Sequence, residues 1–133
     1  MARIYSLPKG ASLFYEVLKI AMREKFRTAQ VVAVGGVDRL TLAYFNRQKK
    51  KYEERIYDEF FEVTSMLGNI TLKDGEPFLH IHGTFGRRDM SVVGGHVISA
   101  SVFPLLEVVI TPTKNTARRR FDDELGVNVV FKT

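Results

Sequence analysis

All three histidines of this sequence lie close together, at positions 80, 82 and 96. His80 and His82 form an H-x-H pair within EPFLHIHGTFG, and His96 follows a glycine pair in VVGGHV. Residues i and i+2 of a β-strand point to the same side of a sheet, with Cα atoms about 6.5–7 Å apart. Two imidazoles at this spacing can therefore converge on one ion. Imidazole binds zinc, nickel, copper and iron, and zinc sites with three protein ligands keep a fourth position open.

The participation of His96 depends on the register between two strands. If the segments 78–84 and 92–99 are antiparallel neighbours, a register that places His96 opposite His80 or His82 brings all three rings to one face. A slip by one residue would turn His96 to the other face. The alternative is that the histidines are ordinary, partly exposed strand residues, because an H-x-H pair alone is a weak signal. The clustering of all three in one predicted hairpin favours a divalent transition metal, with zinc preferred.

Three further residues are candidates for the surroundings of this site. Gly94 and Gly95 could form a β-bulge that re-aims the third histidine, and they permit close approach of a ligand, an ion or a neighbouring chain. Glu107 stands in the apolar run PLLEVVI. A buried carboxylate is costly unless it is paired, so Glu107 could orient a ligand histidine. The alternative is a solvated Glu107 on the outer side of a strand whose neighbours Leu106 and Val108 face inward.

The elements that must position these residues indicate an α+β domain. Apolar residues from Leu13 to Met22 recur at helical spacing and predict an amphipathic helix over 12–26, with Ser12 as its N-cap. The remaining apolar runs predict strands at 2–7, 29–34, 37–45, 52–57, 60–72, on both sides of GRRDMS, at LEVVITP ending at Pro112, and at 127–131. Because strands do not alternate with helices, we expect an antiparallel β-sheet with one main helix packed on it.

The composition limits the classes of protein that fit. A chain of 133 residues predicts a single domain over residues 1–133. The absence of cysteine excludes disulfides, thiolate catalysis and Cys-ligated metal sites. We see no secretory signal and no apolar run of membrane-spanning length, so we expect a cytoplasmic protein without a membrane partner.

The basic residues raise the alternative of nucleic-acid binding. The net charge is +5, and tight basic runs occur at Lys49–Lys51, Arg87–Arg88 and Arg118–Arg120. Such runs could contact phosphates. No helix-turn-helix, zinc-finger or RNP-like aromatic pattern accompanies them, and charged runs in loops are usually solvated surface.

The combination of these motifs resembles the plants-and-prokaryotes-conserved (PPC) domain, a family that is also labelled a domain of unknown function. The resemblance is carried by GEPFLHIHGTFG, VVGGHV and LEVVIT. It extends through VVAVGGVDRLTLAYF and FFEVTSMLGNITLKDGEPF to the closing RRRFDDELGVNVV, which is nearly the whole chain.

This resemblance implies a compact α+β fold that assembles as a homotrimer. It also implies that His80, His82 and His96 form a metal-binding cluster, with Gly94 and Gly95 as the family's glycines and Glu107 at its acidic position. The plant members are nuclear proteins that read A·T-rich DNA with an AT-hook, an Arg-Gly-Arg core flanked by prolines. This chain has no such core, so DNA binding does not follow from the motif.

Three functions remain open at this point. The first is a trimeric module that binds a metal or another small ligand. The second is a DNA-binding or transcription-associated protein that acts through basic surface loops. The third is a metal-dependent hydrolase, in which three histidines would hold an ion that lowers the pKa of bound water toward about 7. Glu107 is the only carboxylate that the local sequence offers as a general base, and other catalytic motifs are missing. We therefore expect a binding module rather than an enzyme and assign no catalytic residue.

Overall fold

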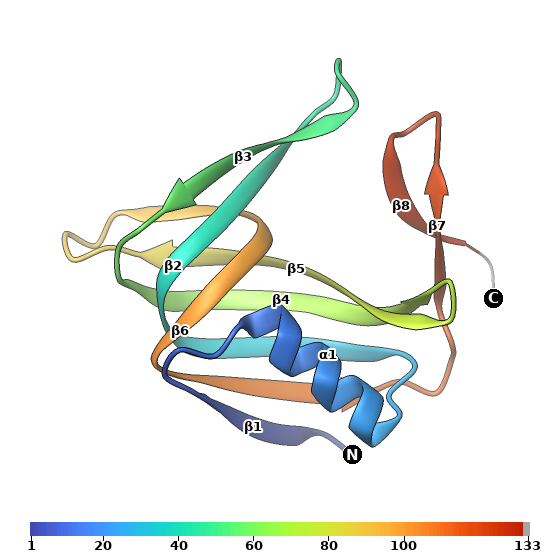
Figure 1. The fold of residues 1–133 in the computed structure, drawn as a ribbon, viewed down its shortest axis with the longest axis horizontal. Coiled ribbons are helices and arrows are strands. Elements are labelled where there is room, and N and C mark those ends of the chain that lie inside the picture. Colours follow the sequence, from blue (N-terminus) through green and yellow to red (C-terminus); the bar gives the residue numbers. More distant parts are fainter. Residues whose placement is uncertain (132–133) are drawn as a thin grey trace.

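The computed structural model describes residues 1–131, and within this range the chain forms one helix and eight strands (Figure 1). These elements are β1 (Arg3–Pro8), α1 (Leu13–Glu24), β2 (Ala29–Asn46), β3 (Lys51–Tyr57), β4 (Phe61–Lys73), β5 (Glu76–Gly86), β6 (Val92–Pro112), β7 (Arg118–Asp122) and β8 (Val127–Phe131). The predicted α+β class, with one helix on a mostly antiparallel sheet, is confirmed.

The helix forms where the apolar spacing predicts it. The side-chain oxygen of Ser12 accepts a hydrogen bond from the backbone N–H of Tyr15 at 3.4 Å, which caps the first turn. After Glu24 the chain leaves the helix through Lys25, whose φ of 58° is left-handed. The buried face of α1 consists of Leu13, Val17, Ile20 and Ala21. This face packs on the sheet, across which α1 lies in Figure 1.

The sheet has the strand order β3-β2-β6-β5-β4-β7-β8, with β1 paired to β6. A further pairing joins β2 to β4. The pairings β2–β6, β6–β5, β5–β4 and β4–β2 therefore make a closed circuit of four strands around the core. Within residues 1–131, no helix combines the length and the apolar character that crossing a membrane requires.

Two strands are longer than the sequence pattern predicts. The segments 29–34 and 37–45 are both parts of β2, because Gly35 and Gly36 bend the strand without ending it. A Cβ on Gly36 would lie 2.1 Å from the carbonyl oxygen of Phe103, so only glycine allows β6 to approach this closely. The segments 92–99 and 106–112 are likewise parts of one strand, β6.

Strand β5 separates the core from the candidate site. Leu79, Ile81 and Phe85 point into the core and are at most 5% exposed. His80 and His82 alternate with them and therefore point to the other side of the sheet. The hydrophobic alternation of this strand thus fixes the direction of both imidazoles.

Candidate metal centre

The register of β5 and β6 brings the three histidines together. His82 lies directly opposite His96, which is one of the two registers that would place all three rings on one face. The ring centroids are 5.0 Å apart for His80 and His82, 5.4 Å for His80 and His96, and 5.3 Å for His82 and His96. One ring nitrogen from each histidine lies within 4.8 Å of the other two.

Neighbouring strands hold two of these rings in place. Tyr52 of β3 stacks on His96, with centroids 4.6 Å apart and an interplanar angle of 21°. Arg119 of β7 places its Nη2 3.4 Å from Nδ1 of His80. His80 and His96 are partly buried, whereas His82 is exposed. The cluster therefore has two histidines on its inner side and one histidine at the surface.

The electrostatic surroundings favour the neutral form of the two inner histidines. Burial, followed by the positive charges of Arg119 and the other two histidines, lowers the pKa of His80 from 6.5 to about 4. Burial and then His82 lower the pKa of His96 below its ordinary value. Both rings are therefore neutral at pH 7, which is the form of imidazole that binds a metal.

The geometry fits a transition-metal ion. Two nitrogens that bind one tetrahedral zinc at about 2.0–2.1 Å are roughly 3.3 Å apart. Nε2 of His80 and Nε2 of His82 are separated by 3.2 Å. Nδ1 of His96 is buried and has no hydrogen-bond partner within residues 1–131, a deficit that coordination by this nitrogen would remove. The three nitrogen donors thus have the ligand type that zinc binds, and the pair from His80 and His82 has the spacing that a tetrahedral zinc requires.

The glycines before His96 have a different role from the predicted bulge. Gly94 and Gly95 pair regularly with Thr84 and Gly83 of β5. A Cβ on Gly94 would lie 3.0 Å from the carbonyl oxygen of Gly83. A Cβ on Gly95 would lie 3.0 Å from the carbonyl oxygen of Ala43. The two glycines therefore let β5 and β2 approach β6 closely. They also line a surface hollow next to His82.

Glu107 does not lie beside the histidines of its own chain. It is exposed, and its strand neighbours Leu106 and Val108 are buried. Its partner on β2 is Val34, whereas the partner of His96 on that strand is Ala43. The group of metal-ligating side chains that forms within residues 1–131 contains no carboxylate. A role for Glu107 as partner of a ligand histidine stays a prediction.

Arg119 is a residue of the site that the sequence pattern did not reveal. The sequence pattern predicts no strand over its run, 118–120, and such basic runs are usually solvated loops. The structure instead places it in strand β7, where Arg118 and Arg120 are exposed and Arg119 is buried. The alternation of a strand over 118–122 would have been the signal. It was missed because β7 pairs in parallel with the distant strand β4.

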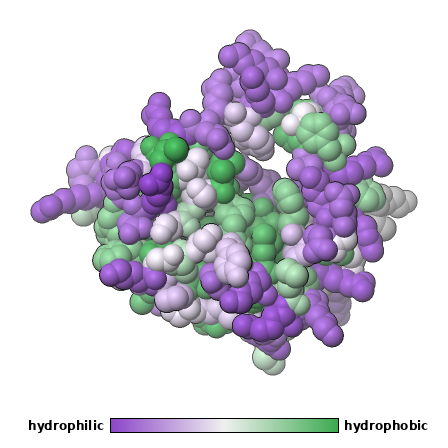
Figure 2. Space-filling view, in the orientation of Figure 1, coloured by the Kyte–Doolittle hydropathy of each residue, from purple (hydrophilic) through white to green (hydrophobic). Residues whose placement is uncertain are grey.

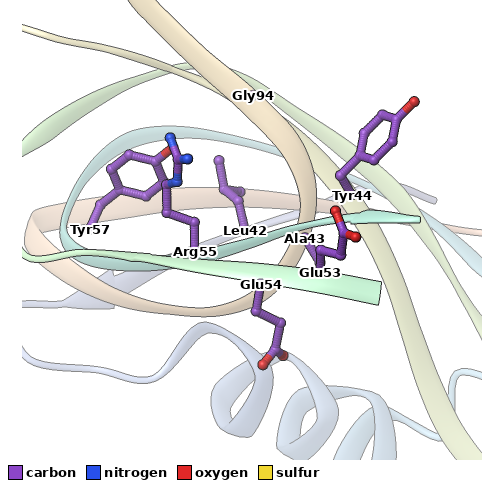
Figure 3. A pocket seen from close by; sticks show the side chains of 8 residues that line it. All are labelled: Leu42, Ala43, Tyr44, Glu53, Glu54, Arg55, Tyr57 and Gly94. Atoms are coloured by element: carbon purple, nitrogen blue, oxygen red, sulfur yellow. The ribbon is translucent and has the colours of Figure 1, made fainter. Parts of the chain in front are cut away.

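A cavity of about 260 Å³ lies between β2 and β3, is lined by none of the three histidines, and brings no reactive groups together. Its charged lining residues are Glu53, Glu54 and Arg55. Figure 3 shows Glu54 pointing away from Arg55 and Tyr57, so the polar ends of these side chains diverge. The histidine cluster is therefore the better candidate for a functional site.

Comparison with known proteins agrees with this fold. The Plants and Prokaryotes Conserved (PCC) domain matches residues 2–114. A metal-containing protein from Archaeoglobus fulgidus is 30% identical and has a TM-score of 0.93. The match covers 99% of this chain and 94% of that protein. No curated protein matches the chain.

Two further solved structures share the fold over nearly their whole length. A plant- and prokaryote-conserved (PPC) protein from Pyrococcus horikoshii is 26% identical, with a TM-score of 0.92 and coverage of 100% of this chain and 92% of that one. A candidate DNA-binding protein from Bacteroides thetaiotaomicron is 25% identical, with a TM-score of 0.93 and coverage of 98% and 91%.

Proposed function

The chain belongs to the Plants and Prokaryotes Conserved domain family, and from this premise we propose that it is a metal-binding module that assembles as a homotrimer. His80, His82 and His96 hold one divalent transition-metal ion, with zinc as the preferred metal. The observation that carries this proposal is the convergence of the three ring nitrogens within 4.8 Å. The metal-containing relative from Archaeoglobus fulgidus supports it.

The three histidines would leave one position of a tetrahedral ion for a ligand from outside. Such an ion polarises a bound oxygen or lowers the pKa of a bound water. A hydrolase needs a general base near that position, and Glu107 lies elsewhere on β6 in the single chain. For this reason the geometry supports ligand binding better than hydrolysis.

The outer face of the sheet supports self-association next to the metal site. The strand register places Ile4 beside Val109, Val109 beside Val32, Val32 beside Leu67, and Leu67 beside His82. Ile4 is 73% exposed, Val32 40% and Leu67 59%. Exposed apolar surface that continues across several strands is typical of an interface. A neighbouring chain that packs on Ile4, Val32 and Leu67 would lie close to His82, the exposed histidine of the proposed site.

Native mass spectrometry of the full chain, purified without chelators and supplied with zinc, tests both parts of the proposal. We expect an assembly of three times the 15.2 kDa chain mass that carries one zinc per chain. A monomer with one zinc would refute the trimer and leave the metal site standing. A trimer that binds no zinc would refute the metal site.

Nucleic-acid binding is a second proposal, supported by a solvated basic hairpin and by the candidate DNA-binding relative. Lys49, Lys50 and Lys51 lie exposed where β2 turns into β3. The other basic runs support it less, because Arg119 is buried and Arg87 pairs with Glu59 at 2.8 Å.

Fluorescence anisotropy with a labelled DNA duplex at two salt concentrations tests this second proposal. If the hairpin contacts phosphates, the logarithm of the binding constant falls linearly with the logarithm of the salt concentration. Replacing its three lysines by glutamine should then make this slope less negative by up to about three units. Absence of binding at low salt would remove the proposal.

A further inference from the structure

Arg119 carries a buried charge that no anion balances in the described part of the chain. Its exposed fraction is 8%. Its guanidinium donates to three neutral groups: the hydroxyl of Thr71 at 3.0 Å, the side-chain oxygen of Asn69 at 2.9 Å, and the backbone carbonyl of Asn128 at 3.1 Å. None of the ion pairs within residues 1–131 includes Arg119. A buried cation is costly unless an anion pairs with it.

This guanidinium faces a cavity that also reaches the histidines. The cavity has a volume of about 350 Å³. It lies between the β2–β3 hairpin and the β7–β8 hairpin, where Figure 2 shows the molecule hollowed. Its polar lining residues include His80, His96 and Arg119, and its aromatic ones are Tyr52, Phe78 and Phe121. The charge of Arg119 is thus available to a molecule that enters beside the metal site.

Metal binding would free a further hydrogen-bond donor of Arg119. If His80 binds an ion through Nε2, its proton lies on Nδ1, because a neutral imidazole has only one N–H. Nδ1 can then no longer accept the hydrogen bond from Nη2 of Arg119, which is 3.4 Å away. Two donors would face each other at this distance. Ligand histidines normally donate their second N–H to a carboxylate, a carbonyl or a water, so an acceptor is needed here.

We infer that this cavity binds a small organic carboxylate beside the metal. The carboxylate accepts hydrogen bonds from Arg119 and from Nδ1 of His80, and the apolar part of the molecule lies against the aromatic walls. A guanidinium has five N–H groups, and its three neutral partners take three of them. Once His80 no longer accepts, two remain, the number that a bidentate carboxylate uses. The inference rests on the proposed metal site, since metal binding at His80 creates the second free donor.

The apolar walls specify the rest of the ligand. The ring centroid of Phe78 lies 5.5 Å from the guanidinium carbon of Arg119. The ring of Tyr52 stacks on that of His96. Phe121 is 56% exposed at the cavity wall. These rings give the cavity an apolar, aromatic lining next to the positive charge of Arg119. An aromatic carboxylate such as benzoate matches both features, whereas acetate lacks the apolar part.

Calorimetric titration of the zinc-loaded full chain with benzoate and with its neutral analogue benzamide tests the inference on the native protein. We expect benzoate to bind in the millimolar range or tighter, and at least about tenfold more tightly than benzamide, because only benzoate can pair with the guanidinium. Equal affinities, or no binding of benzoate, would overturn it. Zinc content measured on the same sample separates the two proposals: bound zinc without benzoate binding refutes only the carboxylate site, and absence of zinc refutes both.

Variants locate the site within the molecule. Arg119→Gln should weaken benzoate binding by at least about tenfold while zinc content stays at one per chain. Arg119→Lys keeps a charge without the planar fork and should weaken it less. Arg118→Gln is the matched control, since Arg118 is the exposed neighbour on the same strand. Unchanged binding in a folded Arg119→Gln protein would overturn the assignment. If that variant does not fold, the comparison of benzoate with benzamide decides.

Discussion

Replacement of both His80 and His82 by alanine should abolish stoichiometric zinc binding. Loss of a partner that only orients a ligand costs about 10–100-fold in metal affinity, so loss of two ligands should cost more than about 100-fold. The wild-type protein gains stability from zinc because the ion binds the folded state, by about 2.7 kcal/mol at a hundredfold excess over Kd. The double variant should gain none.

Zinc content by elemental analysis and thermal unfolding with and without zinc measure this effect. Glu76→Gln is the matched control, because Glu76 is an exposed residue at the start of the same strand. It should bind zinc as the wild type does. If the double variant retains one zinc per chain, the ion binds elsewhere and the histidine site is wrong.

Replacement of Gly68 by alanine should both destabilise the protein and weaken metal binding. Gly68 lies in β4 opposite Ile81 of β5. A Cβ at this position would lie 2.0 Å from the carbonyl oxygen of His80 and 2.7 Å from Cα of Ile81. Both contacts are with backbone, so β5 must shift. Overpacking of this kind costs about 1–3 kcal/mol or more, and the shift would move His80 out of its position.

Urea unfolding of the metal-free protein and a separate zinc titration measure the two effects of Gly68→Ala. Gly86→Ala is the control, because its new Cβ would meet the methyl group of Thr64 at 3.2 Å and the carbonyl oxygen of Glu62 at 3.7 Å, so no backbone atom lies closer than ordinary contact distance. We expect little change there. A Gly68→Ala protein with wild-type stability and wild-type zinc affinity would contradict the close strand packing described here.

The convergence of the three histidines was predictable because it depends on local regularities. Alternation along β5 fixes the common direction of His80 and His82, and the short turn from β5 to β6 limits the register in which His96 can lie. The same holds for α1, whose apolar spacing and capping residue Ser12 define it without any tertiary information. These features extend over a few residues, and the sequence shows them directly.

The surroundings of the site were less predictable because distant segments form them. Arg119 comes next to His80 only because β7 pairs in parallel with β4. No local sequence pattern predicts such a pairing. Tyr52 reaches His96 from a different hairpin. The continuity of β2 through Gly35 and Gly36 also depends on the neighbouring strand β6, which the glycines let approach. Contacts of this kind depend on which strands become neighbours in the folded sheet, and a local sequence pattern does not show that.

Anomalous X-ray scattering at the zinc edge, from crystals of the full chain grown with zinc, tests the central claim most directly. We predict one anomalous peak per chain, at about 2.0–2.1 Å from one nitrogen each of His80, His82 and His96. Crystals in which zinc binds at other positions while no peak lies between these three rings would contradict it.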